Sequence, residues 1–473
     1  MVRMAVLVLL FTLAAVIESV RLTSLSSLAN SDIWWHLSSG LWILKNHALP
    51  RTGLFSQFLS NSWMATSWGY EVMLAGLYKL LGLRAIPALL MCLKTALALV
   101  TFLLAQGFRG RFWPAVALST IAQYIFAAAQ PTPVYFSILF VGLELYVLFE
   151  SRASHSARPL FWLPLLFFAW ANLDDQFGYG IALLFIFVLV TWVEELVRRG
   201  GSKIAPRAFI MLVISGTGTV ITPYFYRGYE AFFTQASSAA NPYMPDFSAL
   251  GFRQARDYAL LLLFMSAFVA LGMRRSRNPF QIALLLGCAA FSFHSQRDAW
   301  LVVIAAVAVI GDAIPESPKE AGFKVLNLYR PATVCIVIAI LAIAMLAGIP
   351  RNENVLLAKA AENYPVLACN FIRQNRLPQP IFNNYQWGGF LTWYLPQYPV
   401  AVDSRNDLYG DEVIIQYFRV MNADEPYIAF PEMAQAKTLL LQKKSIMADA
   451  MSTVPSYRIA YSDDVSMVLS KRE

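Results

Sequence analysis

The stretch Asp32-Ile33-Trp34-Trp35-His36-Leu37 places a carboxylate, two indoles and an imidazole directly after the first apolar run of the chain. An aspartate close to a lipid bilayer is costly unless it is solvated or paired, so Asp32 is a candidate functional residue. The same aspartate precedes a predicted helix over 33–46, where a carboxylate would cap the free N–H groups of the first turn. The spacing supports a functional role and a capping role equally, and the two are compatible.

The aromatic and imidazole side chains after Asp32 each allow more than one interpretation. Trp34 and Trp35 fit an aromatic belt at a membrane surface as well as a platform on which a sugar stacks. His36 lies one helical turn after Asp32, so it could pair with that carboxylate, modulate its pKa or bind a metal ion. With one histidine and one aspartate in the stretch, pairing is favoured over a metal.

Two further polar clusters lie between apolar runs. Asp174 and Asp175 follow Trp170, and adjacent carboxylates cannot share one face of a helix, so one would point to a site and the other to water. A polar helix end between spans explains the same residues equally well. Arg297 is the candidate for binding a phosphate, and a buried pair of Arg297 with Asp298 that joins two helices is an equal alternative.

The last quarter of the chain has its own candidates. Asp403 and Arg405 follow a predicted strand over 400–402, and the end of a strand is a good location for a binding site. A structural Asp–Arg pair is at least as well supported. The pair Gly388-Gly389 permits a close backbone approach after a strand, but it lacks the Gly-x-Gly-x-x-Gly spacing of a dinucleotide site.

Composition assigns the chain to a class. Of its 473 residues, 58% are hydrophobic and only 14% are charged, whereas a soluble protein carries about 25% charged residues. The chain is therefore predicted to be an integral membrane protein. The net charge of +8 arises from basic residues in short loops, which orient membrane spans, so nucleic acid is not an expected partner. The four cysteines have no Cys-x-x-Cys or Cys/His spacing, so neither a disulfide framework nor a zinc site is predicted.

A helix needs about 20 apolar residues to cross a bilayer, and we predict about eleven such spans. The predicted spans are 4–22, 84–105, 112–129, 133–150, 159–173, 178–197, 206–224, 257–273, 279–294, 298–314 and 328–348. A further run over 63–83 has aromatic residues at one end and Glu71 and Lys79 inside it, so a position in the membrane interface suits it better than a span.

Basic residues predict the orientation. With 63–83 lying flat, the loops that contain Arg109, Arg152, Arg198 and Arg274 fall on the same side as Arg3, which places the N-terminus in the cytoplasm. The outer face then collects the loop 23–83, Asp174 and Asp175, the loop 225–256, the region 294–298 and everything after about 350.

Two domains are expected on this basis. Residues 1–349 form a multi-span transmembrane domain that includes the outer loop 23–83, and residues 350–473 form a small soluble α/β domain outside the cytoplasm. Within the second domain, a helical segment over 353–375 is predicted to break at Tyr364-Pro365. The predicted strands are 381–382, 400–402, 438–441 and 465–469, and the predicted helices are 411–422 and 444–451.

The pattern Asp32-x-Trp34-Trp35-His36-Leu37-x-x-Gly40, followed by a tryptophan-rich segment around Trp63 and Trp68, resembles the first outer loop of the GT-C superfamily of polytopic membrane glycosyltransferases. More specifically, it is similar to a group of bacterial glycosyltransferase-like membrane proteins. The resemblance implies transfer of a sugar from a polyprenyl phosphate to an acceptor on the outer side of the cytoplasmic membrane. Related proteins commonly have histidine where this chain has Asp174, so the role of that position does not carry over directly.

The resemblance also implies site roles. Asp32, the acidic residue after the first span, would lie at the catalytic centre and remove a proton from the acceptor. Asp174 and Asp175 would supplement it, and Arg297 would bind the donor phosphate. Trp34, Trp35, His36, Asp403 and Arg405 would contribute to substrate binding. No cofactor is expected, and metal-independent chemistry is favoured over a divalent ion bound by the aspartates.

Two other function classes fit the same residues. A non-catalytic protein would bind a lipid-linked glycan or take part in envelope assembly. A polymerase or ligase of surface polysaccharide would need a lipid diphosphate donor and an essential arginine pair in its largest outer loop, where Arg227, Arg253 and Arg256 lie. The acidic first loop is the better-developed feature and favours the glycosyltransferase.

Overall fold

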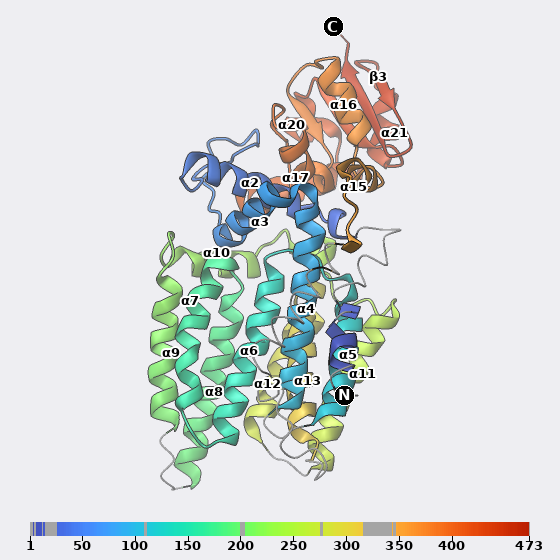
Figure 1. Cartoon of the computed structure of the whole chain (residues 1–473). Helices are drawn as coiled ribbons and strands as arrows, with labels where there is room; N and C mark the ends of the chain where they lie inside the picture. Colours follow the sequence, from blue (N-terminus) through green and yellow to red (C-terminus); the bar gives the residue numbers. More distant parts are fainter. Residues whose placement is uncertain are drawn as a thin grey trace. The chain divides into compact units, whose positions relative to one another are not determined.

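A computed structural model describes residues 26–107, 111–198, 204–274, 278–315 and 347–472, with positions 3, 6–11, 13, 14 and 343 (Figure 1). Most of the predicted spans 4–22 and 328–348 and part of the basic loops lie outside the described residues. The chain divides into two compact units. The helical unit comprises 1–20, 90–232 and 244–349, and the mixed unit comprises 21–89, 233–243 and 350–473.

Each of the nine spans predicted between residues 84 and 314 coincides with a helix of the structure within a few residues at each end. The helices of the helical unit are α4 (Ala85–Gln106, whose first residues belong to the mixed unit), α5 (Phe112–Ile125), α6 (Val134–Ala153), α7 (Leu163–Leu173), α8 (Phe177–Arg198), α9 (Ile204–Val220), α11 (Ala255–Met273), α12 (Pro279–His294) and α13 (Trp300–Ala313). The helix α10 (Arg227–Ala236) has residues in both units. Residues 300–311 of α13 are all buried, and α13 packs against α5, α6, α11 and α12. A helix that is apolar on every side belongs in the middle of a bundle.

Several helices are suited to a membrane. Among the described residues, four are long and apolar enough to span it, namely Trp68–Gln106, Val134–Ala153, Phe177–Val197 and Ala255–Met273. Three shorter apolar helices cover Phe112–Ala128, Ile204–Val220 and Pro279–His294. The first of the four combines α3 (Trp68–Leu81) with α4, and the chain turns between them at Gly82, which has a positive φ. The 22 residues of α4 alone correspond to about 33 Å of helix, enough for a bilayer core. The total of about eleven spans remains a prediction.

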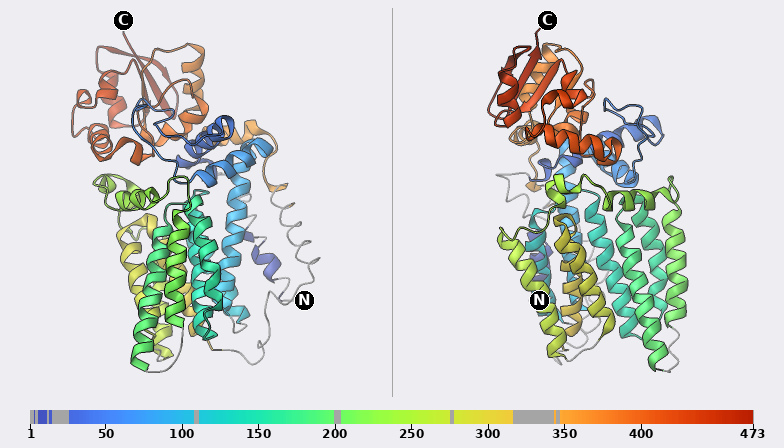
Figure 2. Two further views of the ribbon diagram at one scale, coloured as in Figure 1. Left: turned by 90° about the vertical axis from the view of Figure 1, so that its left-hand side faces the viewer. Right: turned by 180° about the vertical axis from the view of Figure 1, so that it is seen from behind.

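The mixed unit contains one four-stranded sheet and several short helices (Figure 2). The strands β1 (Ile381–Asn383), β2 (Thr438–Gln442), β3 (Tyr457–Ser462) and β4 (Ser466–Lys471) are arranged in the order β1-β2-β4-β3. The first pair is parallel, with Ile381 opposite Thr438, and the other two pairs are antiparallel. The helices after residue 350 are α15 (Glu353–Ala360), α16 (Val366–Gln374), α17 (Tyr385–Tyr394), α18 (Asn406–Tyr409), α19 (Asp411–Met421), α20 (Pro431–Ala434) and α21 (Ile446–Ser452).

Most of the α/β pattern predicted for the C-terminal segment is confirmed, including the helix break between α15 and α16. The strand predicted over 400–402 is wrong, because Val400 forms only an isolated bridge with Ser56. The sequence analysis also missed β3 and α17. The strand β3 lies at the edge of the sheet and its exposed Ile459 breaks the expected alternation. The helix α17 contains a glycine pair that favours a loop on local propensity.

The loop 23–83 packs with the C-terminal segment inside the mixed unit. Trp34 in α2 (Asp32–Asn46) has no exposed surface and contacts Phe390 and Trp393 of α17, with ring centroids 5.2 and 4.8 Å away. The side chain of Gln57 donates hydrogen bonds to the carbonyls of Ile381 at 2.6 Å and Pro399 at 3.1 Å. The outer loop thus shares a core with residues after 350, and the domain boundary predicted at 349/350 remains a prediction.

The glycine pair of α17 explains how these segments come so close. A Cβ atom at Gly388 would overlap the carbonyl oxygen of Val402, and one at Gly389 would overlap that of Ser31. The close backbone approach predicted for Gly388-Gly389 is therefore present. Since the two obstructing atoms belong to the backbone, they cannot rotate away as a flexible side chain would.

We expect Gly389→Ala to destabilise the mixed unit by about 1–3 kcal/mol, because the added methyl group must displace the backbone at Ser31. The matched control is Gly76→Ala in α3, where a Cβ meets nothing within 4 Å. The melting temperature of each full-length variant measures its stability. The rate of limited proteolysis after residue 350 shows whether the loss lies in the mixed unit. Equal melting temperatures of the Gly389→Ala and Gly76→Ala proteins would contradict the expectation.

Candidate functional site

Asp32 is not the residue that caps the helix. The helix α2 begins at Asp32 itself, and the side-chain oxygen of Asn30 accepts hydrogen bonds from the backbone N–H groups of Asp32 at 2.8 Å and Ile33 at 3.2 Å. The capping alternative is therefore wrong. Asp32 is instead the first residue of the helix, where its carboxylate lies at the positive end of the helix dipole.

Two hydroxyl groups donate to the Asp32 carboxylate. Ser31 Oγ lies 3.2 Å from Oδ1, and Ser404 Oγ donates to the same oxygen. Trp35 Nε1 in turn donates to Ser404 Oγ at 3.1 Å. An indole N–H can only donate, so the single hydroxyl hydrogen of Ser404 remains for Asp32. The same Oδ1 atom therefore accepts from both hydroxyl groups.

His36 pairs with a residue that the sequence analysis did not assign to the site. Its Nδ1 atom lies 3.2 Å from Oε1 of Glu71 in α3, and Glu71 is fully buried. Burial lowers the pKa of His36 well below its usual value, and the charge of Arg405 lowers it further. The imidazole is therefore neutral at pH 7 and its ring lies against Trp35, with 3.6 Å between centroids. The signal that could have found this partner was an acidic residue within the apolar run 63–83.

Asp403 and Arg405 form the structural pair. Both side chains are buried, with Nε 3.0 Å from Oδ1 and Nη2 2.6 Å from Oδ2. The guanidinium also lies 4.9 Å from the ring centroid of Trp63. Trp34 and His36 are buried as well. The Asp403–Arg405 pair flanks Ser404, and the backbone N–H of Arg405 donates to Asp403 at 2.9 Å.

The helical unit contains a second carboxyl group that accepts from a serine hydroxyl, and an indole N–H again donates to that serine. Asp174 follows α7, is almost fully buried and accepts a hydrogen bond from Ser137 of α6. Trp170 Nε1 donates to Ser137 Oγ at 2.6 Å. Burial raises the pKa of Asp174 to about 8, the neighbouring Asp175 raises it too, and Ser137 and Arg297 oppose the shift. Asp175 is only half-buried, so the two adjacent carboxylates occupy different environments, as expected.

Arg297 lies next to the loop that carries these aspartates. With the Gln176 amide oriented so that its oxygen faces the guanidinium, that oxygen accepts from Nη2 at 2.9 Å and from Nε at 3.0 Å. The guanidinium also lies 5.1 Å from the ring centroid of Phe247. Gln176 was not predicted as a partner. The contact joins the turn between α7 and α8 to the turn before α13.

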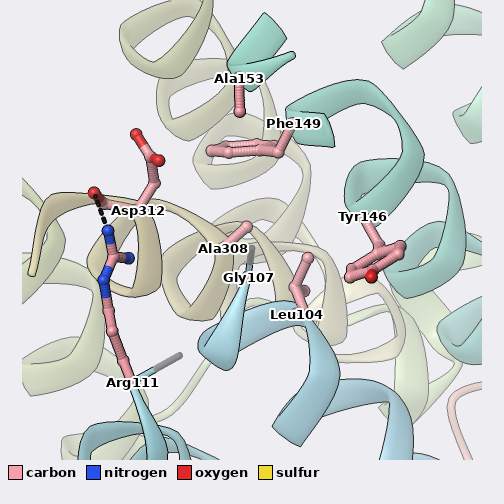
Figure 3. Close-up of a pocket in the computed structure, with 8 residues that line it drawn as sticks. All are labelled: Leu104, Gly107, Arg111, Tyr146, Phe149, Ala153, Ala308 and Asp312. Atoms are coloured by element: carbon pink, nitrogen blue, oxygen red, sulfur yellow. Dashed lines mark hydrogen bonds between the residues drawn. The ribbon is translucent and has the colours of Figure 1, made fainter. Parts of the chain in front are cut away.

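A small cavity of the helical unit contains none of the predicted site residues (Figure 3). It is lined by Leu104, Gly107, Arg111, Tyr146, Phe149, Ala153, Ala308 and Asp312. Asp312 accepts from Arg274 at 3.1 Å and from Gln281 at 2.9 Å, so its carboxylate ties helix ends together. Along α6 the cavity begins about 14 Å from Ser137, because Tyr146, the lining residue of α6 nearest to Ser137, follows it by nine positions. In the part of the chain that the structure describes, no three His, Cys, Asp or Glu side chains gather as ligands of a metal ion.

Solved structures show what this fold is. Over 96% of this chain and 97% of the other, it matches ArnT from Cupriavidus metallidurans bound to undecaprenyl phosphate, with a TM-score of 0.54 and 13% identity. It matches the oligosaccharyltransferase of Archaeoglobus fulgidus, tethered to an acceptor peptide, over 100% of this chain and 74% of that one, with a TM-score of 0.54 and 11% identity. The sequence matches no protein-family model and no curated protein. The chain therefore shares the fold of ArnT and of this oligosaccharyltransferase.

The raised pKa of Asp174 predicts a pH-dependent difference between the wild type and Asp174→Asn. Between the ordinary pKa of 3.8 and about 8, the folded protein retains a proton that the unfolded chain releases. The contribution of Asp174 to stability is therefore complete below the lower value and falls as the pH rises to the upper one. Asparagine does not ionise, so the melting temperature of Asp174→Asn relative to wild type should rise from about pH 5 to about pH 8.

The control for this experiment is Asp246→Asn, because Asp246 is an exposed aspartate of the same unit. The difference in melting temperature between Asp246→Asn and the wild type should change little over the same pH range. A difference for Asp174→Asn that stays constant, or falls with rising pH, shows that Asp174 is ionised in the folded protein.

Proposed function

We propose that this chain is a membrane glycosyltransferase that moves a sugar from a polyprenyl-phosphate donor to an acceptor on the outer face of the bacterial cytoplasmic membrane. The observation that carries the proposal is the match of nearly the whole chain to ArnT, whose structure contains undecaprenyl phosphate. The first-loop aspartate with its hydroxyl partners supports it. On this proposal the N-terminus is cytoplasmic, and the segment after residue 350 lies outside the cytoplasm.

Asp32 is the proposed general base. It would accept the proton of the acceptor hydroxyl while the acceptor oxygen forms a bond to the anomeric carbon of the sugar and the bond from that carbon to the phosphate oxygen breaks. The polyprenyl phosphate leaves with the bonding electrons, and attack of the acceptor oxygen on the opposite face of the anomeric carbon inverts its configuration. A carboxylate that accepts two hydroxyl hydrogen bonds and is only half-buried can receive a proton from such a substrate. Trp35, beside it, would line the sugar site, and the buried His36 would support the Trp35 ring from behind.

Arg297 is the proposed partner of the donor phosphate. A guanidinium has five N–H donors in a plane and binds phosphate oxygens in pairs. Two of its nitrogens contact Gln176, and the side chain is only half-buried, so further donors can reach a ligand. Asp174 and Asp175, on the same turn as Gln176, would supplement this site in metal-independent chemistry. The burial of Trp34, Asp403 and Arg405 supports a role in shaping the site rather than in binding substrate.

Donor binding is tested with undecaprenyl phosphate and the full-length protein in lipid nanodiscs. We expect Arg297→Ala to weaken binding by at least about tenfold, because it removes a charge-assisted contact. Arg207→Ala is the control, since Arg207 is an exposed arginine of the same unit that belongs to none of the candidate sites. Equal affinities of the two variants, measured by native mass spectrometry, argue against a phosphate site at Arg297.

Catalysis is tested by transfer from undecaprenyl-phosphate-linked hexoses in proteoliposomes that contain lipid extract as a source of acceptors. Loss of a general base should lower the rate of Asp32→Asn and Asp32→Ala by roughly 100- to 10,000-fold. Asp424→Asn, at an exposed aspartate of the same unit, should have the wild-type rate. Full activity of both Asp32 variants would exclude the catalytic role. Lipid binding by the wild type without any turnover would support a non-catalytic glycan-binding protein, and turnover of a lipid diphosphate alone would support a polymerase or ligase.

A further inference from the structure

We propose that Ser404 is the positioning residue of Asp32, so that the segment after residue 350 orients the catalytic base. The inference rests on the proposed function and goes beyond it, because it assigns a role to a residue outside the first loop. Ser404 donates to Asp32 Oδ1 and accepts from Trp35 Nε1 at 3.1 Å. Both partners of Ser404 thus lie in the first turn of α2.

The direction of the two hydrogen bonds is determined by their chemistry. The Trp35 indole has no acceptor, so the contact with Ser404 can only run from Nε1 to Oγ. A serine hydroxyl has one hydrogen, and the nearby carboxylate is the stronger acceptor for it. The order Trp35, Ser404, Asp32 therefore directs one hydroxyl hydrogen at Oδ1 and limits rotation of the carboxylate.

The backbone on both sides of Ser404 is restrained by buried contacts. Before it, the side chain of Asn383 accepts from the backbone N–H of Ala401 and donates to the carbonyl of Val402, both at 2.8 Å. Asp403 and Arg405, the residues on either side of Ser404, form a buried ion pair. The backbone N–H of Arg405 also donates to the Asp403 side chain, which closes a turn around the serine. These restraints explain why a serine on an irregular segment can hold one position.

The helix α17 brings this segment to the start of α2. Gly388 lies against the carbonyl of Val402, and Gly389 lies against the carbonyl of Ser31, the residue before Asp32. Two adjacent glycines therefore contact the two backbone segments that carry Ser404 and Asp32. The contact between serine and aspartate is a product of this packing, and the C-terminal segment is expected to act in the reaction without touching the substrate.

The variants Ser404→Ala, Ser404→Thr and Trp35→Phe test the inference in the transfer assay with the undecaprenyl-phosphate-linked hexose that the wild type uses. Loss of one hydrogen bond to a charged group should lower kcat of Ser404→Ala roughly ten- to hundredfold. The KM for the donor and the binding of undecaprenyl phosphate should change less than about twofold, because only an interaction of the base is removed. Threonine retains the hydroxyl and should restore most of kcat. Trp35→Phe retains a ring but loses the N–H that orients Ser404, and should lower kcat as well.

The control is Ser452→Ala, at an exposed serine near the end of α21 in the same unit, which should have the wild-type kcat. Wild-type kcat in Ser404→Ala overturns the proposal whatever its melting temperature. A loss of kcat that threonine does not restore also overturns it, because packing and not the hydroxyl would then be responsible. If the wild type and Asp424→Asn transfer no sugar, the proposed function fails and the inference fails with it. If they are active while Asp32→Asn is inactive and Ser404→Ala is active, only the inference fails.

Discussion

The close packing of α17 against two other backbone segments is the constraint on which the mixed unit depends. Gly388 and Gly389 have no Cβ, so the helix approaches Val402 and Ser31 more closely than any other residue pair would allow. The approach completes a core in which Trp34 contacts Phe390 and Trp393. It also puts Ser404 in hydrogen-bonding contact with Asp32. Stability of the unit and orientation of the proposed base therefore have one cause.

Two aspartates of the chain have partners of the same kind in different surroundings. In each case an indole N–H donates to a serine hydroxyl, and the hydroxyl donates to the carboxyl group. Asp32 is half-buried, whereas Asp174 is almost fully buried beside Asp175, and its pKa is raised to about 8. Carboxyl groups whose environments differ in this way suit different tasks.

The two units hold their polar groups in different ways. In the helical unit, apolar helices surround α13, whose residues 300–311 are all buried, and the polar partners Asp174, Ser137 and Arg297 gather near helix ends. Polar groups are least costly there, because water and free backbone groups are within reach. In the mixed unit, the segment 401–405 is irregular, and Asn383 together with the buried Asp403–Arg405 pair restrains it. Irregular backbone can thus carry a well-positioned side chain.

The sequence by itself determined the helices of the helical unit, the break between α15 and α16 and three of the four strands. Those features depend on apolar periodicity and on proline, which act over a few residues. It also identified Asp32, Asp174 and Arg297 as candidates, because charged residues beside apolar runs are rare. Only the tertiary structure decided their partners. Ser404 lies 372 positions after Asp32, Glu71 lies 35 after His36, and Ser137 lies 37 before Asp174. Partners so far apart in the chain meet through packing, as at Gly388 and Gly389, and no local pattern of residue types specifies such a meeting.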